Sequence, residues 1–174
     1  MSKALVVIDV QKIMFMHPPF LPHDGEAVVD RIAGLIEKAR AANTPVFFVQ
    51  HHALEHEHMK PGAPGFPFVD KLTPAPGDDV TVKHKSSAFH DTDLDAKLKA
   101  AGVGHLVITG MQSEYCVTSA IRGAYERGYG ITLVSDAHST GDTKVAKAKD
   151  IVAIISDTTA DSFGTVIPAA EVVF

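Results

Sequence analysis

A run of five apolar residues, Ala4-Leu5-Val6-Val7-Ile8, lies near the start of the chain and is followed directly by Asp9. Uninterrupted apolar runs rich in β-branched residues are typical of parallel strands that helices cover on both faces. A carboxylate at the end of such a strand loses its hydration, which is costly unless a partner compensates for it. The run therefore predicts a central strand that ends in Asp9, which either has a structural role, as a helix cap or in an ion pair, or acts as a catalytic base.

Apolar runs alternate with stretches of helical spacing along the rest of the chain. The predicted strands cover residues 4–8, 45–50, 80–82, 106–109 and 131–134, with a sixth at 166–167 or 172–174. The predicted helices cover residues 24–42, 94–101, 115–127 and 143–156. Strands that alternate with helices form βαβ units with right-handed crossovers. We therefore expect residues 1–174 to form one α/β domain, a three-layer α/β/α Rossmann-like fold with a six-stranded, mostly parallel sheet.

Composition argues against several classes of function. The net charge of −5 gives no basic footprint, so no nucleic-acid partner is expected. The apolar run at the N-terminus is too short for a secretion signal, and no run approaches the roughly 18 residues of a membrane span. We expect a cytoplasmic protein with no membrane partner. No glycine-rich phosphate-binding turn follows a strand, so no cofactor is expected.

Cys116 is the only cysteine, so it can form neither an intrachain disulfide nor a thiolate cage for a metal. An inert buried thiol and a reactive one are both open. The residue lies near the start of a predicted helix, where the positive helix end would lower a thiol pKa. The unpaired backbone N–H groups there could bind an oxyanion. This position suits the nucleophile of an acyl transfer.

Lys83 follows the short strand at 80–82 and, taken alone, would be a solvated strand end. Together with Asp9 and Cys116 it could hold a thiolate by its charge and orient the carboxylate. Lys85 lies two residues further along and would share the same side of an extended chain, so it is the alternative.

Read in order, these residues resemble the isochorismatase-like cysteine hydrolases. The matching blocks are residues 4–11 with Phe15, residues 82–89 with Thr92 and Leu94, residues 110–117 with Gly128 and Tyr129, and residues 134–137. The blocks fall in the family's order and span most of the chain. The resemblance implies six parallel strands and a triad of Asp9, Lys83 and Cys116. If the strand order is 3-2-1-4-5-6, Lys83 starts two strands from Asp9 and has to reach about 10 Å.

The resemblance also implies a non-proline cis peptide before Gln112, which would aim the N–H groups of Gln112 and Cys116 at the substrate oxygen. Asp9 would deprotonate Cys116, the thiolate would attack an amide carbonyl, and water would hydrolyse the thioester. The implied function is cleavage of a small amide-type substrate with a non-peptide C–N bond. Alternatives are a vinyl-ether or ester hydrolase and a catalytically silent member that binds a small molecule.

This sequence departs from the family pattern at two places. Ser86 stands where an aromatic residue is common, so one aromatic near the pocket is missing. The nicotinamidase branch binds a metal through an Asp-x-His pair after the second strand, but residues 50–54 contain no aspartate. We therefore expect neither nicotinamidase activity nor a metal at that place. The presence of Cys116 favours amide chemistry over vinyl-ether chemistry.

A histidine-rich segment follows the second strand and contains His51, His52, His56 and His58. Residues 52–56 match the H-x-x-E-H pattern of zinc proteases, which requires a stable helix. The segment leaves room for two turns at most before Pro61, so we expect a solvated, pH-sensitive loop with only His51 near the pocket. Residues 61–77 form one long irregular stretch, either a lid or a subunit contact.

The pocket candidates suggest a substrate that is small and planar or partly apolar. They are Phe15, His51, Phe89, Gln112 and Tyr115. By analogy with the family we expect a homodimer or a homotetramer.

Overall fold

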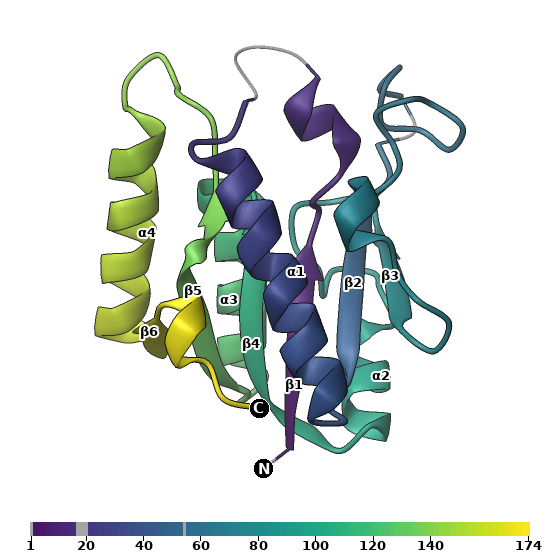
Figure 1. The fold of residues 1–174 in the computed structure, drawn as a ribbon, viewed down its shortest axis with the longest axis vertical. Coiled ribbons are helices and arrows are strands. Elements are labelled where there is room, and N and C mark those ends of the chain that lie inside the picture. Colours follow the sequence, from purple (N-terminus) through teal and green to yellow (C-terminus); the bar gives the residue numbers. More distant parts are fainter. Residues whose placement is uncertain (1, 17–20, 54) are drawn as a thin grey trace.

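A parallel sheet runs through the centre of the molecule in the strand order β3-β2-β1-β4-β5-β6 (Figure 1). The structure is a computed structural model that describes residues 2–16, 21–53 and 55–174. Its strands are β1 (Ser2–Ile8), β2 (Val46–His51), β3 (Asp79–Lys83), β4 (Val103–Met111), β5 (Gly130–Ser139) and β6 (Thr165–Ile167). Each neighbouring pair is parallel, so the predicted fold class and strand order are confirmed.

Helices cover both faces of the sheet. Helix α1 (Gly25–Ala41) packs on one face, against the side chains of Leu5 and Val7 in β1. Helices α2 (Leu94–Ala100) and α3 (Thr118–Glu126) pack on the other face, against Val6 and Ile8. Helix α4 (Ala148–Ser162) runs along β5 and β6. Because successive residues of a strand point to opposite faces, the single apolar run of β1 supplies both cores.

Two predicted helices differ from those observed. The helix expected at 143–156 is α4, which begins and ends several residues later. Asp142 accepts a hydrogen bond from the Ala148 N–H (2.9 Å) and pairs with Lys147 (2.7 Å), which closes the preceding residues as a turn. The helix expected at 115–127 is instead a π-turn at Ser113–Val117 followed by α3.

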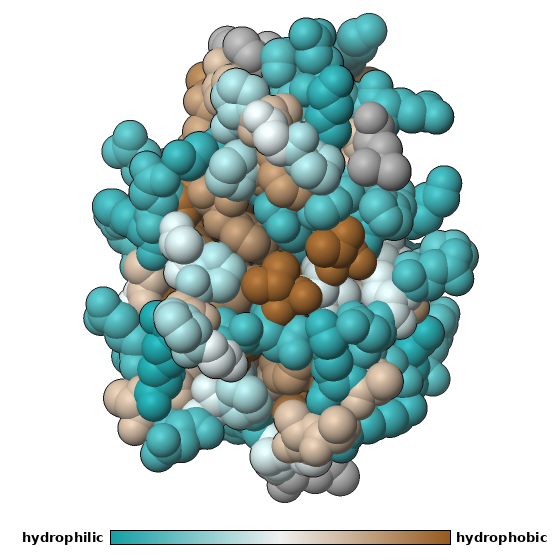
Figure 2. Space-filling model, turned by 90° about the vertical axis from the view of Figure 1, so that its right-hand side faces the viewer, coloured by the Kyte–Doolittle hydropathy of each residue, from teal (hydrophilic) through white to brown (hydrophobic). Residues whose placement is uncertain are grey.

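At the C-terminus, the first of the two alternatives for the sixth strand is the observed one. Residues 172–174 form no strand, and Val172 packs into the core beneath α1. Figure 2 faces the β3 edge of the sheet, where hydrophobic side chains lie within a mostly hydrophilic surface. The exposed apolar residues of β3 are Val80 and Val82. None of the helices in the described ranges is long and apolar enough to cross a membrane.

Gly110 allows the ends of β1 and β4 to meet closely. It pairs with Ile8 and has φ 124°, a conformation that side chains disfavour. A Cβ atom at this position would lie 2.1 Å from the Ile8 carbonyl oxygen. The glycine therefore lets β4 bend beside Asp9 before the chain enters the turn that carries Cys116.

Candidate active site

The site lies where the carboxyl ends of four neighbouring strands meet, the usual ligand position in an open α/β sheet. Asp9 follows β1, His51 ends β2, and Lys83 ends β3. Cys116 lies in the π-turn that follows β4. Since β1 lies between β2 and β4, the sheet order places these four side chains around one point.

Asp9 is fully buried and marks the point where the chain leaves β1. Its φ of 50° lies in the left-handed region, which aspartate tolerates better than most residues. Its N–H still donates to the Val49 carbonyl (3.0 Å), while its own carbonyl accepts from the Gln11 N–H (2.8 Å). The backbone therefore turns at Asp9 while both of its polar groups stay paired.

Lys83 is also fully buried and reaches across β2 to β1. Its Nζ lies 2.7 Å from Asp9 Oδ2 and 3.2 Å from Cys116 Sγ. The alternative, Lys85, has an exposed side chain, and only its carbonyl contributes, accepting from Lys83 Nζ at 3.0 Å. The geometry thus brings Asp9, Lys83 and Cys116 together and leaves the side chain of Lys85 outside.

The turn that carries Cys116 is wider than an α-helix. The Gln112 carbonyl accepts from the N–H groups of Tyr115 (3.1 Å) and Val117 (3.2 Å). In a regular α-helix this carbonyl would bond to the amide of Cys116. Here it bonds instead to the amides of the residues just before and just after Cys116. The peptide bond between Met111 and Gln112 is cis, as the family resemblance implied.

Burial controls the charges of the site. It raises the pKa of Asp9 above its usual value, and the Lys83 charge opposes this only in part. It also raises the pKa of the Cys116 thiol to about 12, and the Asp9 charge adds to the effect. The expected lowering of this pKa at a helix start is therefore wrong, because the loss of hydration outweighs it. The resting site holds a neutral thiol.

Gln11 was not predicted as a site residue, yet it fixes the β2 end. The buried amide donates to the carbonyls of Phe66 (2.7 Å) and His51 (3.2 Å) and accepts from the His51 N–H (3.0 Å). Burial, followed by the Lys83 charge, lowers the pKa of His51 to about 4, so this imidazole is neutral at pH 7. The only sign in the sequence that Gln11 belongs to the site was its place as a polar residue two positions after Asp9.

Asp9, His51 and Cys116 place one ligand-type atom each within 4.8 Å of one another, a spacing that suits a metal ion. Lys83 Nζ, however, lies 2.7 Å from Asp9 and 3.2 Å from both His51 Nδ1 and Cys116 Sγ. The ammonium group thus already provides the positive charge at the centre of this cluster. The three residues fit a lysine-centred site better than a metal centre.

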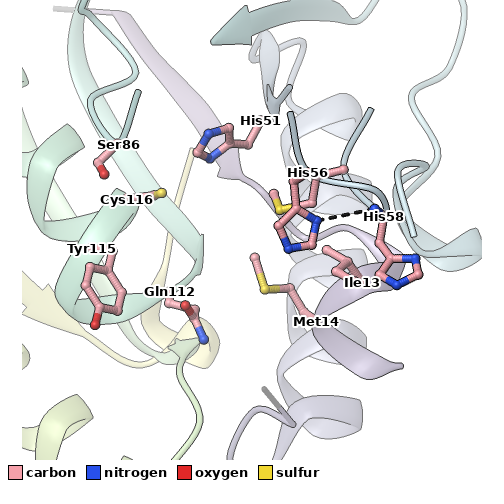
Figure 3. Close-up of a pocket in the computed structure, with 10 residues that line it drawn as sticks. Ile13, Met14, His51, His56, His58, Ser86, Gln112, Tyr115 and Cys116 are labelled. Carbon is pink, nitrogen blue, oxygen red and sulfur yellow. Dashed lines mark hydrogen bonds between the residues drawn. The ribbon is translucent and has the colours of Figure 1, made fainter. Parts of the chain in front are cut away.

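A pocket of about 360 Å³ opens over Cys116 (Figure 3). Of the predicted pocket residues, His51, Gln112 and Tyr115 line it. The lining residues that were not predicted are Ile13, Met14, His56, His58, Met59 and Ser86. They come from loops after β1, β2 and β3, and in Figure 3 the Met14 and His56 side chains lie across the cavity from Tyr115 and Gln112.

The other two predicted pocket residues are not among those that line this cavity. Phe89 is buried in the core, stacks on Tyr129 (6.2 Å between ring centroids) and lies under the Arg127 guanidinium. Phe15 packs on the α1 side of the sheet, next to Gly25. Both rings pack against other side chains of the protein. The residue type alone could not show whether a phenylalanine packs in this way or contacts a ligand.

The histidine-rich segment forms one wall of the pocket. His56 and His58 line it, where a purely solvated loop was expected. The described residues between 52 and 60 form turns and bends, so the helix that a zinc protease needs is missing from them. Further along, the N–H groups of Lys12 and Ile13 donate to the carbonyls of Pro67 (2.8 Å) and Gly65 (2.9 Å). These bonds hold residues 65 and 67 of the 61–77 stretch against the segment that follows β1.

A buried histidine lies behind the π-turn. His138 Nδ1 is 2.8 Å from the hydroxyl of Ser113, and its Nε2 is 3.0 Å from the hydroxyl of Ser156 in α4. Burial lowers the pKa of His138 to about 4, so the ring is neutral. The bridge ties the turn that carries Cys116 to β5 and α4.

Comparisons with known proteins show the family and the fold of this chain. Residues 3–171 match the family model of the Isochorismatase domain. The ureidoacrylate amidohydrolase of Methylobacterium radiotolerans is 32% identical over 181 residues, covering 83% of this chain and 70% of that protein. An isochorismatase from Pseudomonas putida superposes with a TM-score of 0.93 at 30% identity, covering 99% of this chain and 90% of that one. N-carbamoylsarcosine amidase from Thermoplasma acidophilum superposes with a TM-score of 0.83 at 28% identity, covering 99% of both chains.

Proposed function

This chain belongs to the isochorismatase family, and on that premise we propose that it hydrolyses a small amide-type substrate with Cys116 as nucleophile. The observation that carries the proposal is the contact of one ammonium, Lys83 Nζ, with both the Asp9 carboxylate and the Cys116 sulfur. A similar protein is an amidohydrolase and a similar structure is an amidase, which supports cleavage of a non-peptide C–N bond.

Asp9 is the base in the first step. Its pKa is raised by burial, so it holds a proton more readily than an ordinary carboxylate. Cys116 rests as a thiol, and its proton passes to Asp9 as the sulfur attacks the carbonyl carbon. The thiol becomes more acidic as the C–S bond forms, so no free thiolate has to accumulate. Lys83 Nζ, 3.2 Å from the sulfur, stabilises the negative charge that develops there while the proton leaves.

The oxygen of the tetrahedral intermediate needs hydrogen-bond donors. We assign this role to the backbone N–H groups of Gln112 and Cys116. The Gln112 carbonyl accepts from the amides on either side of Cys116, those of Tyr115 and Val117, which supports this role for the Cys116 amide. Donors fixed before the reaction stabilise developing charge without reorganisation.

In the remaining steps Asp9 transfers protons to the leaving group and from water. Protonated Asp9 gives its proton to the leaving nitrogen as the C–N bond breaks, which releases ammonia or an amine and leaves a thioester on Cys116. Water then attacks the thioester, Asp9 accepts its proton, and that proton returns to the sulfur when the acid product leaves. The net reaction consumes one water and forms a carboxylic acid and an amine.

The cavity limits the size of the substrate. Its volume of about 360 Å³ is at the low end for ligand pockets, and Ile13, Met14 and Met59 give it apolar walls. Polar groups of Ser86, Gln112 and Tyr115 lie on the Cys116 side in Figure 3. A short amide with one apolar part fits this division.

The test is a panel of small primary and secondary amides, carbamoyl and ureido compounds, with released ammonia or amine as the readout. We expect turnover in the wild type and none in Cys116→Ala. Denaturing mass spectrometry should find an acyl group on Cys116 during turnover, removable by hydroxylamine.

Esters and vinyl ethers form the comparison arm of the same panel. Turnover of these compounds alone would overturn the amide assignment. Turnover that survives in Cys116→Ala would overturn the nucleophile. Tight binding of an amide without release of any product would identify a binding protein instead.

A further inference from the structure

Lys83 faces more hydrogen-bond partners than its ammonium can serve. Four atoms lie within reach of Nζ: Asp9 Oδ2 (2.7 Å), the Lys85 carbonyl oxygen (3.0 Å), His51 Nδ1 (3.2 Å) and Cys116 Sγ (3.2 Å). An ammonium has three N–H bonds and cannot accept a hydrogen bond. The shorter contacts to Asp9 and Lys85 take two of these bonds, so the third is shared between His51 and Cys116.

This arrangement fixes the proton on His51. A hydrogen on Nδ1 would point at the ammonium, donor against donor, so Nδ1 has to carry its lone pair. The ring is neutral, because burial and the Lys83 charge hold its pKa at about 4. Its single proton therefore lies on Nε2.

The edge of the ring away from Lys83 faces the cavity. His51 lines the pocket, its side chain is 20% exposed, and Figure 3 shows the ring next to Cys116. Nδ1 is turned toward the fully buried Lys83, so the exposed part of the ring is the Nε2 side. Within the described ranges, the polar contacts of the ring, to Lys83 Nζ at 3.2 Å and to Asp9 Oδ2 at 4.0 Å, are both made by Nδ1.

We propose that Lys83 holds His51 as the Nε2–H tautomer, and that this N–H binds a carbonyl or carboxylate oxygen of the substrate beside the scissile carbonyl. The inference rests on the proposed function and narrows its substrate class. The favoured amides carry a second oxygen acceptor close to the bond that is cut, whereas simple alkyl amides are poor substrates. His51 is thus a specificity residue, separate from the proton transfer of Asp9.

The tautomer can be read without any substrate. Protein labelled with ¹⁵N-histidine, assigned by the signal that disappears in His51→Gln, should show His51 as the Nε2–H form at pH 7. His90→Gln, a change at an exposed histidine, is the matched control and should leave that signal in place. An Nδ1–H ring or an imidazolium at pH 7 would overturn the proposal.

The donor can be tested with two alkylating probes that react with the only cysteine. Iodoacetamide carries a carbonyl beside its reactive carbon, whereas allyl bromide has no acceptor. The ratio of their rates cancels changes in the thiol itself. We expect the ratio to fall about 3- to 10-fold in His51→Leu, as for one lost hydrogen bond. It should stay within about 2-fold in His51→Gln, whose amide N–H can take the place of Nε2–H.

An unchanged ratio in His51→Leu would overturn the role of His51 as a donor. These measurements do not depend on hydrolysis. An inactive amide panel together with an Nε2–H ring and a lowered ratio would overturn the amidase assignment and support the donor role of His51.

Discussion

The Lys83 ammonium lies 2.7 Å from the Asp9 carboxylate, and neither side chain is exposed to solvent. Each charge alone would be strongly destabilising at such depth, so the two ions depend on one another. The balance is unequal, however, because burial raises the pKa of Asp9 more than Lys83 lowers it. Lys83 therefore stabilises the buried Asp9 carboxylate, but the pKa of Asp9 stays above its usual value, so Asp9 can still accept a proton.

Replacing Lys83 by Met should expose this dependence. The change leaves a buried carboxylate without its cation, and we expect the unfolding free energy to fall by about 3–5 kcal/mol. Turnover should fall by at least about 10²-fold, since both the base and the sulfur lose their partner. Urea denaturation and amide turnover measure the two effects.

Two further variants separate charge from packing in this test. Lys85→Met, at an exposed side chain nearby, should change the unfolding free energy by less than about 0.5 kcal/mol. The double variant Asp9→Asn with Lys83→Met removes both charges and should recover part of the lost stability but no activity. A double variant as unstable as the sum of its single changes would argue against a coupled pair.

Asp9→Asn should make Cys116 more reactive and the enzyme less active. The Asp9 charge helps to raise the thiol pKa to about 12, so its removal should lower that pKa. Alkylation by iodoacetamide, followed between about pH 7 and pH 10, should be faster in the variant than in the wild type. Amide turnover should nevertheless be lost, because no base remains. A variant that alkylates more slowly than the wild type would contradict this assignment of charges.

Much of the fold could be predicted because its signals are local. Apolar runs such as residues 4–8 and 106–109 mark buried strands, and their alternation with helices determines the layers. The start of α4 was missed because side-chain bonds of Asp142 hold the preceding residues as a turn, and no periodicity reports such bonds.

The candidate site was predictable at its centre and not at its walls. Asp9 follows a strand, Lys83 ends one, and Cys116 lies in the turn after a third. Polar residues at the carboxyl ends of the strands of an α/β sheet lie close together in space. The walls depend instead on long-range backbone bonds, such as that from the Ile13 N–H to the Gly65 carbonyl, which bring distant loops together. For that reason His56 and Met14 could not be assigned to the pocket from their positions in the chain.

His138 should make the protein sensitive to acid. Its pKa is about 4 in the folded state against 6.5 as reference, so the unfolded chain binds this proton first. The contribution of the neutral His138 ring to the unfolding free energy is fully present above about pH 6.5 and is lost as the pH falls toward 4. The slope is at most about 1.4 kcal/mol per pH unit for one proton.

The measurement is the unfolding free energy of the wild type and of His138→Gln across this range. The variant should be less stable at neutral pH, because Ser113 and Ser156 lose a partner, but its stability should fall less steeply with acid. His23→Gln, at a half-exposed histidine, is the control and should keep the wild-type slope. Equal slopes in wild type and His138→Gln would show that another group causes the acid sensitivity.

Gly110→Ala should damage the site through the backbone. A Cβ atom there would lie 2.1 Å from the Ile8 carbonyl oxygen, and the φ of 124° disfavours any side chain. β1 and β4 would have to separate where Asp9 and Cys116 approach each other. We therefore expect the unfolding free energy to fall by several kcal/mol, on the order of that for a strained core substitution, and amide turnover to be lost. Gly34→Ala is the matched control, because Gly34 lies in α1 with nothing within 4 Å of its added Cβ. It should be stabilising by about 0.5–1 kcal/mol. Wild-type turnover in Gly110→Ala would mean that the approach of β4 to Ile8 is not needed to hold Cys116 beside Asp9.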